Sequence, residues 1–337
     1  MIPANIPLGQ PNWRAELARA VDDPAELIQL LGLDAGLLPH ARAAARSFPL
    51  RVPRGFVARM KRGDAADPLL RQVLPLGAEL EQHPGFSTDP TGDLAVISAP
   101  GLLTKYQGRA LLVTTGACAV HCRYCFRRHF PYADSNPRAD GWRTALAAIA
   151  ADPTIDEVIL SGGDPLSLSD TRLSELAAAL AALPQLKRLR IHTRQPVVLP
   201  ERVDDALLAW LAPLRLQKVV VLHANHAQEL DAGVAHACAK LRDAGATLLN
   251  QSVLLRGVND SVAALAALSE RLFTLGALPY YLHQLDRVQG AAHFEVGDRE
   301  ALALHAALTA RLPGYLVPRL VREVAGAPAK QPLAVDA

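Results

Sequence analysis

The sequence has almost no excess of charge of either sign. Its 337 residues include 35 lysines and arginines against 33 aspartates and glutamates, which gives a formal net charge of +2. A chain without a dominant charge has no general attraction for nucleic acid or for an anionic membrane surface. We therefore predict no nucleic-acid partner and no membrane-surface partner.

Long apolar runs and an export signal are also missing. No stretch approaches the roughly 18 consecutive apolar residues that a membrane-spanning helix needs, and the alanine-rich stretch 173–184 ends at Pro184. The first 20 residues lack the basic start and the apolar run of a secretory signal. These absences predict a cytoplasmic protein that does not cross a membrane.

Cysteine is scarce, and its distribution is uneven. Only four cysteines occur, and Cys118, Cys122 and Cys125 form a C-x3-C-x2-C pattern inside GACAVHCRYCFRRHF, residues 116–130. In a reducing compartment, clustered cysteines are more often metal ligands or catalysts than disulfides. The fourth, Cys238, lies in a helical pattern and is predicted to be buried in the core.

From about residue 107 onward the sequence repeats one pattern, in which a short apolar run is followed by a polar turn and a longer helical stretch. The six runs are residues 110–115, 157–162, 189–193, 218–224, 246–255 and 278–285. Six βα units in series predict a parallel sheet with helices on its outer face. An open doubly wound sheet and a curved partial barrel both fit such a series.

Polar residues follow or close nearly every run. They are Cys118, Ser161 to Asp164, His192, Arg194, His223, Asn225, Gln251, His283 and Asp286. Side chains gathered from all the strand ends around one centre favour an α/β fold of the partial (βα)6 barrel type. We predict an α-helical N-terminal region over residues 1–100, the barrel over 101–325, and a C-terminal tail over 326–337. A seventh apolar run, 315–324, precedes the tail.

Three closely spaced thiolates can surround a compact soft metal centre, either an iron–sulfur cluster or zinc. Zinc would need a fourth ligand such as His121 or His129, but structural zinc sites usually take two separated pairs of ligands. Three cysteines in one loop instead leave one iron of a [4Fe–4S] cluster without a protein ligand. An open iron of this kind is a position where a substrate or cofactor can bind.

The cysteine pattern, with Tyr124 before the last cysteine, resembles that of the radical S-adenosylmethionine (SAM) superfamily. In those enzymes SAM binds the open iron and is cleaved to a 5′-deoxyadenosyl radical. The stretch SGGDP, 161–165, resembles the glycine-rich element that binds SAM there. This resemblance implies SAM contacts from Ser161, Gly162, Gly163 and Asp164; an ordinary turn between a strand and a helix is the competing interpretation.

More of the chain resembles the lysine 2,3-aminomutase family. The matching stretches include DPLLRQVLP (67–75), PGLLTKYQGRALLVTTGACAVHCRYCFRRHF (100–130), IHTRQPVVLPERV (191–203) and NQSVLLRGVND (250–260), and the similarity covers roughly residues 50–333. The chain looks most similar to the branch that supplies (R)-β-lysine for modification of elongation factor P. The resemblance implies an isomerase that converts L-lysine to (R)-β-lysine with a [4Fe–4S] cluster, SAM and pyridoxal 5′-phosphate (PLP).

The same resemblance implies roles for the remaining polar residues. Lys330 matches the lysine that forms a Schiff base with PLP, and the glycine run that usually precedes that lysine is reduced here to Gly-Ala-Pro-Ala, 326–329. The residues that match PLP phosphate contacts are Lys105, Tyr106 and Arg109. Those that fall where family members contact SAM or the cofactor are His223, Asn225 and Gln251; a polar residue satisfied within the barrel is the alternative for these three.

Substrate contacts are implied in the same way. Arg127 matches the residue that pairs with the amino-acid carboxylate, whereas Arg123 and Arg128 are expected to form structural or surface pairs. Asp286 and Glu323 match the two acids that bind the ε-amino group, and Glu323 stands where the family usually has aspartate. Two acids favour lysine over glutamate, whose side-chain carboxylate they would repel.

Two other functions remain open at this point: an aminomutase acting on glutamate or another amino acid, and an iron–sulfur or zinc binding module without catalysis. Larger family members carry zinc-binding cysteines in a C-terminal extension, and this sequence has none there, so no structural zinc is expected. The partners implied by the resemblance are a protein that reduces the cluster, elongation factor P, and the enzyme that transfers the lysyl group. The sequence leaves the oligomeric state open.

Overall fold

A mixed ten-stranded sheet forms the centre of the computed structural model, which describes residues 12–133 and 140–334. The strands are β1 (Ile97–Ala99), β2 (Leu102–Tyr106), β3 (Arg109–Thr115), β4 (Glu157–Gly162), β5 (Arg188–Thr193), β6 (Gln217–Leu222), β7 (Ala246–Val253), β8 (Ala277–His283), β9 (Arg319–Arg322) and β10 (Gln331–Pro332). They lie side by side in sequence order. Strands β3 to β9 pair in parallel, while β1, β2 and β10 extend the two edges in antiparallel fashion.

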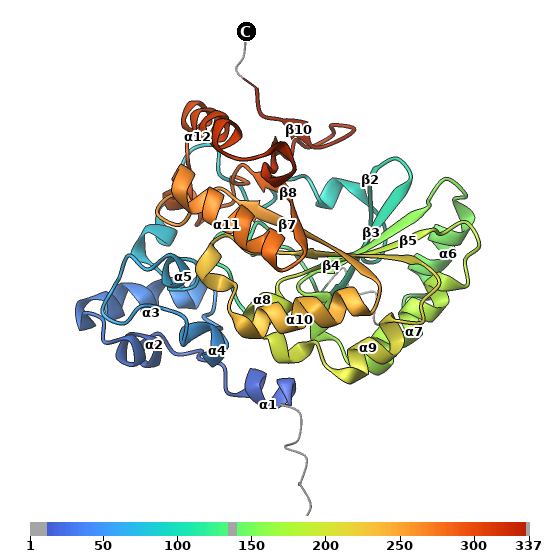
Figure 1. Cartoon of the computed structure of the whole chain (residues 1–337), viewed down its shortest axis with the longest axis horizontal. Coiled ribbons are helices and arrows are strands. Elements are labelled where there is room, and N and C mark those ends of the chain that lie inside the picture. Colours follow the sequence, from blue (N-terminus) through green and yellow to red (C-terminus); the bar gives the residue numbers. More distant parts are fainter. Residues whose placement is uncertain (1–11, 134–139, 335–337) are drawn as a thin grey trace, which may run out of the picture.

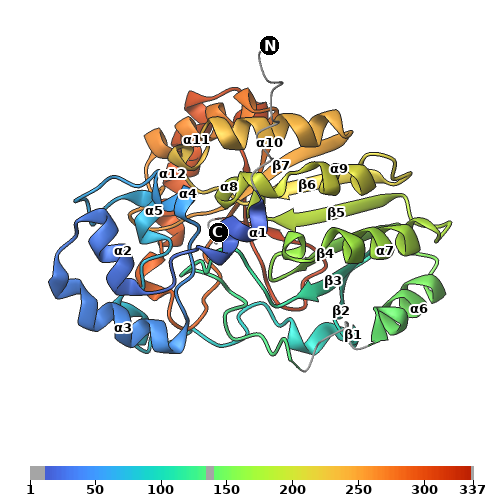
Figure 2. The same cartoon turned by 90° about the horizontal axis from the view of Figure 1, so that it is seen from below.

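The strand order decides between the two predicted architectures. A doubly wound sheet reverses its strand order, and its helices change face at that point. Here the order never reverses, and because parallel crossovers are nearly always right-handed, successive helices lie on the same face. Figures 1 and 2 show α6, α7, α9, α10 and α11 along this outer face. The barrel-type prediction is confirmed, and each of the six predicted strands is found within two residues of its expected ends.

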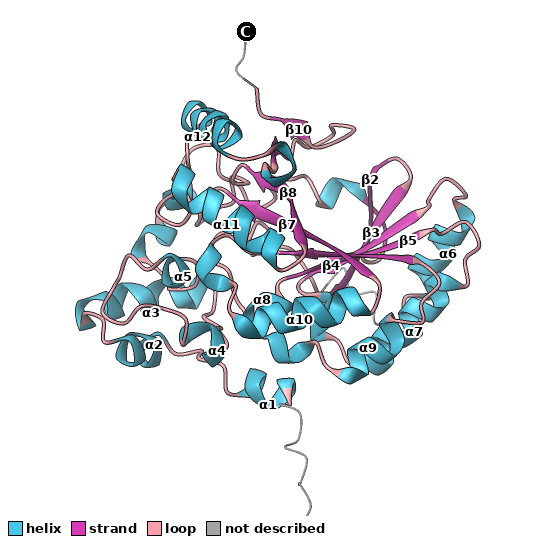
Figure 3. Ribbon diagram, in the orientation of Figure 1, coloured by secondary structure: helices cyan, strands magenta, loops and turns pink. Residues whose placement is uncertain are grey.

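Seven helices belong to this part of the chain. They are α6 (Arg143–Ala151), α7 (Asp170–Ala181), α8 (Gln195–Val198), α9 (Asp205–Leu211), α10 (Ala232–Asp243), α11 (Val262–Thr274) and α12 (Asp298–Arg311). Their arrangement around the strands is shown by secondary structure in Figure 3. None of the helices in the described residues is both long enough and apolar enough to span a membrane.

The alternation of side chains along the strands separates an apolar face from a polar one. In β5, Leu189 and Ile191 are buried in the core beneath the helices, with Leu176 of α7 and Leu241 of α10 in the same cluster. His192, the residue after Ile191, therefore faces the opposite, inner side of the sheet. Burial of each such leucine contributes about 2 kcal/mol, so the outer face stabilises the fold. The inner face is therefore available for the polar residues of a functional site.

The N-terminal region consists of short helices, as predicted. They are α1 (Trp13–Ala18), α2 (Pro24–Leu31), α3 (Leu38–Ser47), α4 (Arg54–Val57) and α5 (Pro68–Arg71). Their shared core includes Ala119 and Val120 of the cysteine loop and Leu199 beyond β5. The N-terminal region thus packs directly against the cysteine loop. The expectation of helix up to residue 100 was wrong for β1, which pairs with β2 to extend the sheet; the boundaries at 100 and 325 stay a prediction.

The tail returns to the sheet instead of leaving it. The seventh apolar run contains β9, which is parallel to β8, and β10 then pairs antiparallel with β9, with Gln331 opposite Arg322. Gly326, at φ 77°, lies in the connecting turn, where glycine adopts this left-handed conformation at little cost. This return brings Lys330 back beside the end of β9.

A buried ion-pair cluster joins the N-terminal region to the cysteine loop. Glu79, in the 3-10 helix η2 (Gly77–Leu80), accepts hydrogen bonds from Arg123 Nε at 2.8 Å and from Arg128 Nη2 at 2.9 Å. All three side chains are at most 2 % exposed. The expectation that the two arginines form structural pairs is confirmed.

Glu79→Gln is expected to destabilise the protein strongly, because it leaves two buried guanidinium groups without a counter-charge. We expect the free energy of unfolding to fall by about 3–5 kcal/mol, the cost of breaking a buried pair on one side. Glu81→Gln, two residues away and exposed, is the matched control and should change stability by less than about 0.5 kcal/mol. Urea unfolding of the apoproteins tests this, and equal midpoints for both variants would contradict it.

Candidate active site

The predicted site residues meet at the C-terminal ends of the parallel strands and on the inner face of the sheet. The cysteine loop follows β3, and the SGGDP stretch closes β4. Arg194 and His223 come directly after β5 and β6, and Asp286 lies three residues beyond β8. The carboxyl ends of parallel strands lie at one edge, so these side chains share one centre. Lys330 reaches the same centre from the returning tail.

Cys118, Cys122 and Cys125 are free, partly exposed thiols in a loop without helix or strand. Burial, together with the charge of neighbouring cysteines, raises the pKa of Cys118 and raises that of Cys125 to about 11. The protein alone therefore does not stabilise three thiolates here. A cationic metal centre would supply the missing positive charge, so the donor set fits an iron–sulfur cluster.

The two histidines of the cysteine loop each contact a backbone carbonyl oxygen. His121 Nδ1 lies 2.9 Å from the carbonyl oxygen of Pro49, and His129 Nε2 lies 3.2 Å from that of Gln289, so both rings are engaged by backbone groups. Within residues 12–133 and 140–334, no three histidine, cysteine or acidic side chains converge on a point that could hold one metal ion.

The glycines of SGGDP let the cysteine loop pack directly on the end of β4. A Cβ atom on Gly163 would lie 2.5 Å from the carbonyl oxygen of Ala117, and one on Gly162, at φ 112°, would lie 2.9 Å from that of Thr115. The backbone N–H groups of Gly163 and Asp164 donate to these same carbonyls of Thr115 and Ala117 at 2.7 and 2.8 Å. The two glycines thus allow the backbone at the end of β4 to lie directly against the backbone of the cysteine loop.

The side chain of Asp164 is fully engaged by protein donors. It accepts hydrogen bonds from the Thr193 hydroxyl at 2.7 Å, from the backbone N–H of Arg194 at 2.8 Å and from that of Leu166 at 3.0 Å. These bonds tie the end of β4 to the end of β5. They satisfy the buried carboxylate of Asp164. The predicted contact between Asp164 and SAM stays a prediction, and the side-chain geometry does not support it.

Arg194 connects a cysteine of the loop to a buried polar network that the sequence did not reveal. Its Nη1 lies 2.8 Å from Cys122 Sγ and donates to the Tyr124 hydroxyl at 2.7 Å. Its Nη2 donates to Gln72 Oε1 at 2.7 Å and to Glu229 Oε2 at 3.0 Å. Only its position after a strand pointed to Arg194, because its partners come from three distant stretches of the chain.

The inner face of the sheet presents amide and imidazole groups. Asn225 donates to the Tyr124 hydroxyl at 2.7 Å, and Gln251 Nε2 lies 3.0 Å from His223 Nε2. Burial lowers the pKa of His223 to about 3, so this ring is neutral. In the described part of the chain, the buried Nε2 atoms of His192 and His283 find no hydrogen-bond partner. Unpartnered polar atoms on this face fit a polar ligand.

Lys330 and Lys105 meet on one carboxylate. Lys330 Nζ donates to Glu323 Oε2 at 2.5 Å, and Lys105 Nζ donates to Glu323 Oε1 at 2.9 Å. Tyr106 also hydrogen bonds Glu323; burial, followed by this carboxylate, raises the pKa of the phenol. Arg109 stacks over the ring of Tyr106 at 5.1 Å. The structure therefore brings together the residues predicted to bind PLP.

Glu323 and Asp286 form an asymmetric pair beside Lys330. Burial by itself raises the pKa of Glu323, but the charges of Lys330 and Lys105 outweigh it and lower the value to about 2. Burial and then the charge of Glu323 raise the pKa of Asp286 to about 7, against the opposing effect of Lys330. One acid is thus permanently ionised, and the other gains or loses its proton near neutral pH.

Arg127 pairs with an acid that sequence reasoning missed. Its Nε donates to Asp93 Oδ2 at 2.7 Å, and its Nη1 donates to the hydroxyl of Ser161 at 3.0 Å. Asp93 Oδ1 lies 2.6 Å from Lys105 Nζ. Burial alone would raise the pKa of Asp93, yet Arg127 and Lys105 lower it to about 2. No motif contains Asp93, so only the folded chain reveals it.

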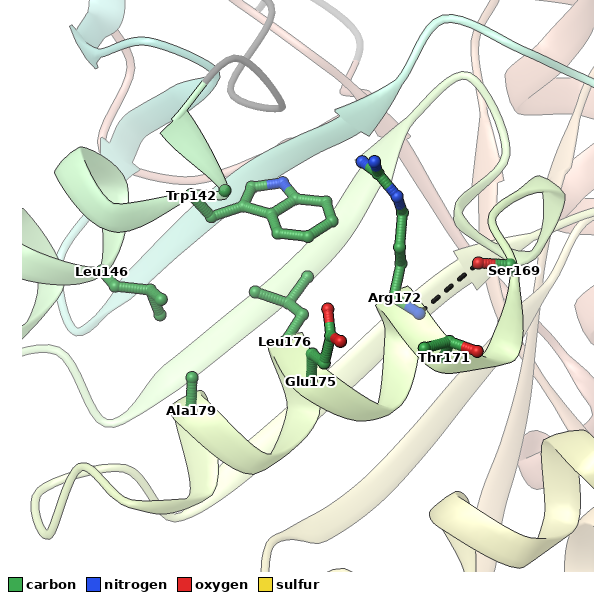
Figure 4. Close-up of a pocket in the computed structure, with 9 residues that line it drawn as sticks. Trp142, Leu146, Ser169, Thr171, Arg172, Glu175, Leu176 and Ala179 are labelled. Atoms are coloured by element: carbon green, nitrogen blue, oxygen red, sulfur yellow. Dashed lines mark hydrogen bonds between the residues drawn. The ribbon is translucent and has the colours of Figure 1, made fainter.

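A separate cavity of about 440 Å³ lies outside the barrel between α6 and α7. Figure 4 shows Trp142, Leu146, Arg172 and Glu175 around it. None of the predicted site residues lines this cavity. It is therefore not the centre assembled by the strand ends.

The sequence of this chain is similar to one protein-family model and to several known proteins. The family model of the radical SAM superfamily matches residues 112–268. L-lysine 2,3-aminomutase of Escherichia coli K12 is 53 % identical over 323 residues, which cover 96 % of this chain and 94 % of that protein. The protein of the same name from Haemophilus influenzae is 48 % identical, over 95 % and 94 % of the two chains. That of Clostridium subterminale is 31 % identical, over 96 % and 77 %.

Proposed function

The chain belongs to the lysine 2,3-aminomutase family of radical SAM enzymes, and we propose that it converts L-lysine to (R)-β-lysine at the C-terminal ends of its strands. The observation that carries this proposal is the convergence of Lys330, Glu323 and Asp286 on one centre, which Lys105 and Asp93 connect to Arg127. The reaction is an isomerisation that moves an amino group from Cα to Cβ without net gain or loss of atoms.

Membership of the radical SAM superfamily implies a [4Fe–4S] cluster and SAM. We assign the cluster to Cys118, Cys122 and Cys125 and the neighbourhood of its open iron to Ser161 and the backbone after β4. PLP is assigned to Lys330 as its covalent attachment point and to Lys105, Tyr106 and Arg109 for its phosphate. When bound, the reduced cluster and SAM supply a radical that takes a hydrogen atom from Cβ, and PLP supplies the carbonyl that carries the migrating amino group.

The chain's own residues hold the substrate at both ends. Arg127 offers a guanidinium to the α-carboxylate, a pairing that fixes orientation as well as position. Glu323 and Asp286 bind the distal ammonium of lysine. When Lys330 takes part in cofactor binding, this ammonium replaces Lys330 as a counter-charge of Glu323. A substrate carboxylate in place of that ammonium would meet two acids, which supports lysine over glutamate.

The ionisation of Asp286 predicts that the KM for lysine depends on pH. Because its pKa is raised to about 7, Asp286 is neutral below that pH and becomes a second counter-charge for the ammonium above it. We expect the KM for lysine to fall severalfold between about pH 6 and pH 8. Asp286→Asn should raise the KM by about tenfold or more and should lose this pH dependence.

Steady-state kinetics at constant ionic strength test this prediction. Glu295→Gln, which removes an acid paired with Arg287 at the surface, is the control and should keep the wild-type profile. An Asp286→Asn variant whose KM still falls with pH as in the wild type would refute the assignment.

The direct test of the proposed function is a substrate comparison. The protein is reconstituted anaerobically with iron, sulfide, PLP and SAM, reduced with dithionite, and offered lysine, glutamate and other amino acids, with products resolved by chiral chromatography. Formation of β-lysine with strong preference for lysine supports the proposal. SAM cleavage without conversion of any lysine, or preference for glutamate, overturns it.

We propose further that the product serves the modification of elongation factor P through its lysyl-transferring enzyme, and that a cellular reducing protein supplies the electron. The support is the high identity to the Escherichia coli relative over nearly both full lengths. A cytoplasmic setting suits the free thiols of the cysteine loop. Mass spectrometry of elongation factor P from cells lacking this chain tests the link, since an unchanged modification would exclude it.

A further inference from the structure

Asp93 links two cations that the proposed function assigns to different ligands. Its carboxylate lies 2.6 Å from Lys105 Nζ through Oδ1 and accepts from Arg127 Nε at 2.7 Å through Oδ2. The residue is 2 % exposed. It comes from the loop before the 3-10 helix η3 (Leu94–Val96), outside the barrel strands and outside the cysteine and glycine motifs. A single buried carboxylate thus touches both the predicted phosphate-binding lysine and the predicted substrate-binding arginine.

The loop around Asp93 holds this carboxylate in place before any ligand arrives. The backbone N–H of Asp93 donates to Asp89 Oδ1 at 2.9 Å, and the Thr91 hydroxyl donates to Asp93 Oδ1 at 3.0 Å. Lys105 Nζ in turn donates to the carbonyl oxygen of Thr91 at 2.8 Å. Gly92, at φ 64°, has no room for a larger side chain, since its Cβ would lie 3.0 Å from Ala325 in the loop that leads to Lys330.

The contacts form a continuous row of alternating charge. The row runs through Lys330, Glu323, Lys105, Asp93 and Arg127, and it ends on the hydroxyl of Ser161. It contains three cations and two carboxylates. Without Asp93, the two neighbouring cations Lys105 and Arg127 would face each other in a buried setting with no charge between them.

The geometry at Arg127 explains what the contact can do. A bidentate bond to a carboxylate needs a guanidinium whose plane is fixed. Asp93 on Nε and Ser161 on Nη1 hold two nitrogens of the guanidinium, and together with the covalent bond from Nε to Cδ they restrain its plane. Small errors in such a plane are costly, because a displacement of about 1 Å can cost about a hundredfold in rate.

We propose that Asp93 is a positioning residue, which fixes Arg127 for the substrate carboxylate and Lys105 for the cofactor phosphate through one shared carboxylate. This inference rests on the proposed function and adds to it a residue that no motif of the family resemblance contains. Substrate binding and PLP binding therefore depend on each other, because Lys105 and Arg127 both contact the Asp93 carboxylate.

The test compares Asp93→Asn, Asp93→Glu and a matched control in the full-length protein. Asp156 provides the control, because it also pairs with one lysine and one arginine, Lys187 and Arg188, but on the outside of the barrel. Asp93→Asn is expected to raise the KM for lysine and the Kd for PLP by about tenfold or more each, with iron content near wild type, while the loss of the buried counter-charge lowers the thermal midpoint. Asp93→Glu should recover part of both losses, and Asp156→Asn should show neither.

Titration of the apoprotein with PLP, followed by visible absorption, gives a readout that does not depend on turnover. Wild-type KM and PLP affinity in Asp93→Asn would overturn the inference, as would losses that Asp93→Glu does not reduce or that occur only together with lost iron. If the wild type fails to convert lysine, the proposed function falls, whereas the PLP affinities of the same variants still decide the role of Asp93.

Discussion

Lys330→Ala is expected to lower the conversion of lysine to β-lysine by at least about a thousandfold, because it removes the amine that we propose as the attachment point of PLP. Glu323 and Tyr281 position the Lys330 side chain. Its Nζ lies 2.5 Å from Glu323 Oε2 and 5.9 Å from the centre of the Tyr281 ring. The cysteine loop lies on a separate stretch after β3, so the variant should keep its cluster and its reductive cleavage of SAM. Chiral chromatography of the product, with iron content and SAM cleavage measured on the same sample, tests all three expectations.

A matched control is Lys187→Ala, which removes an exposed lysine at the start of β5 that pairs only with Asp156 among the described contacts. This variant should retain wild-type turnover. Substantial β-lysine formation by Lys330→Ala would refute the assignment of Lys330. Loss of the cluster in that variant would show that the tail also supports the cysteine loop, which the separate positions of the two segments do not predict.

Cys125→Ser is expected to abolish both the cluster and the cleavage of SAM to below detection, because two remaining cysteines leave a second iron without a protein ligand. The backbone N–H of Cys125 donates to the carbonyl oxygen of Cys122 at 3.0 Å. Serine fits that geometry, so a lost cluster reports the thiolate and not the fold. Iron and sulfide analysis and the visible spectrum of the reconstituted protein measure the outcome.

Cys238→Ala controls for the general effect of removing a cysteine. Cys238 is fully buried in α10, in the core beneath the helices, as expected from the sequence. The variant should lose about 1 kcal/mol of stability at most and should keep its full iron content. A cluster that survives in Cys125→Ser, or one that disappears in Cys238→Ala, would contradict the assignment of the three-cysteine loop.

The barrel and the cysteine loop could be predicted from the sequence because their signals are local. Each strand of the β3–β8 series shows its apolar run, and C-x3-C-x2-C places three ligands within eight positions. The edge strands could not be found in this way. β1 and β10 contain only three and two residues, too few for a pattern of alternation, and they exist because a neighbouring strand offers hydrogen bonds.

The sequence by itself therefore determined the fold class, the cysteine loop and, through family resemblance, the identity of most candidate site residues. Only the tertiary structure decided how these residues act on one another. Lys105 and Glu323 are 218 positions apart, and Lys330 reaches the same carboxylate because the tail returns as β10. Asp93, the contacts of Arg194 and the raised pKa of Asp286 have no local signal, because contact between distant segments, burial and the sum of neighbouring charges are properties of the folded chain.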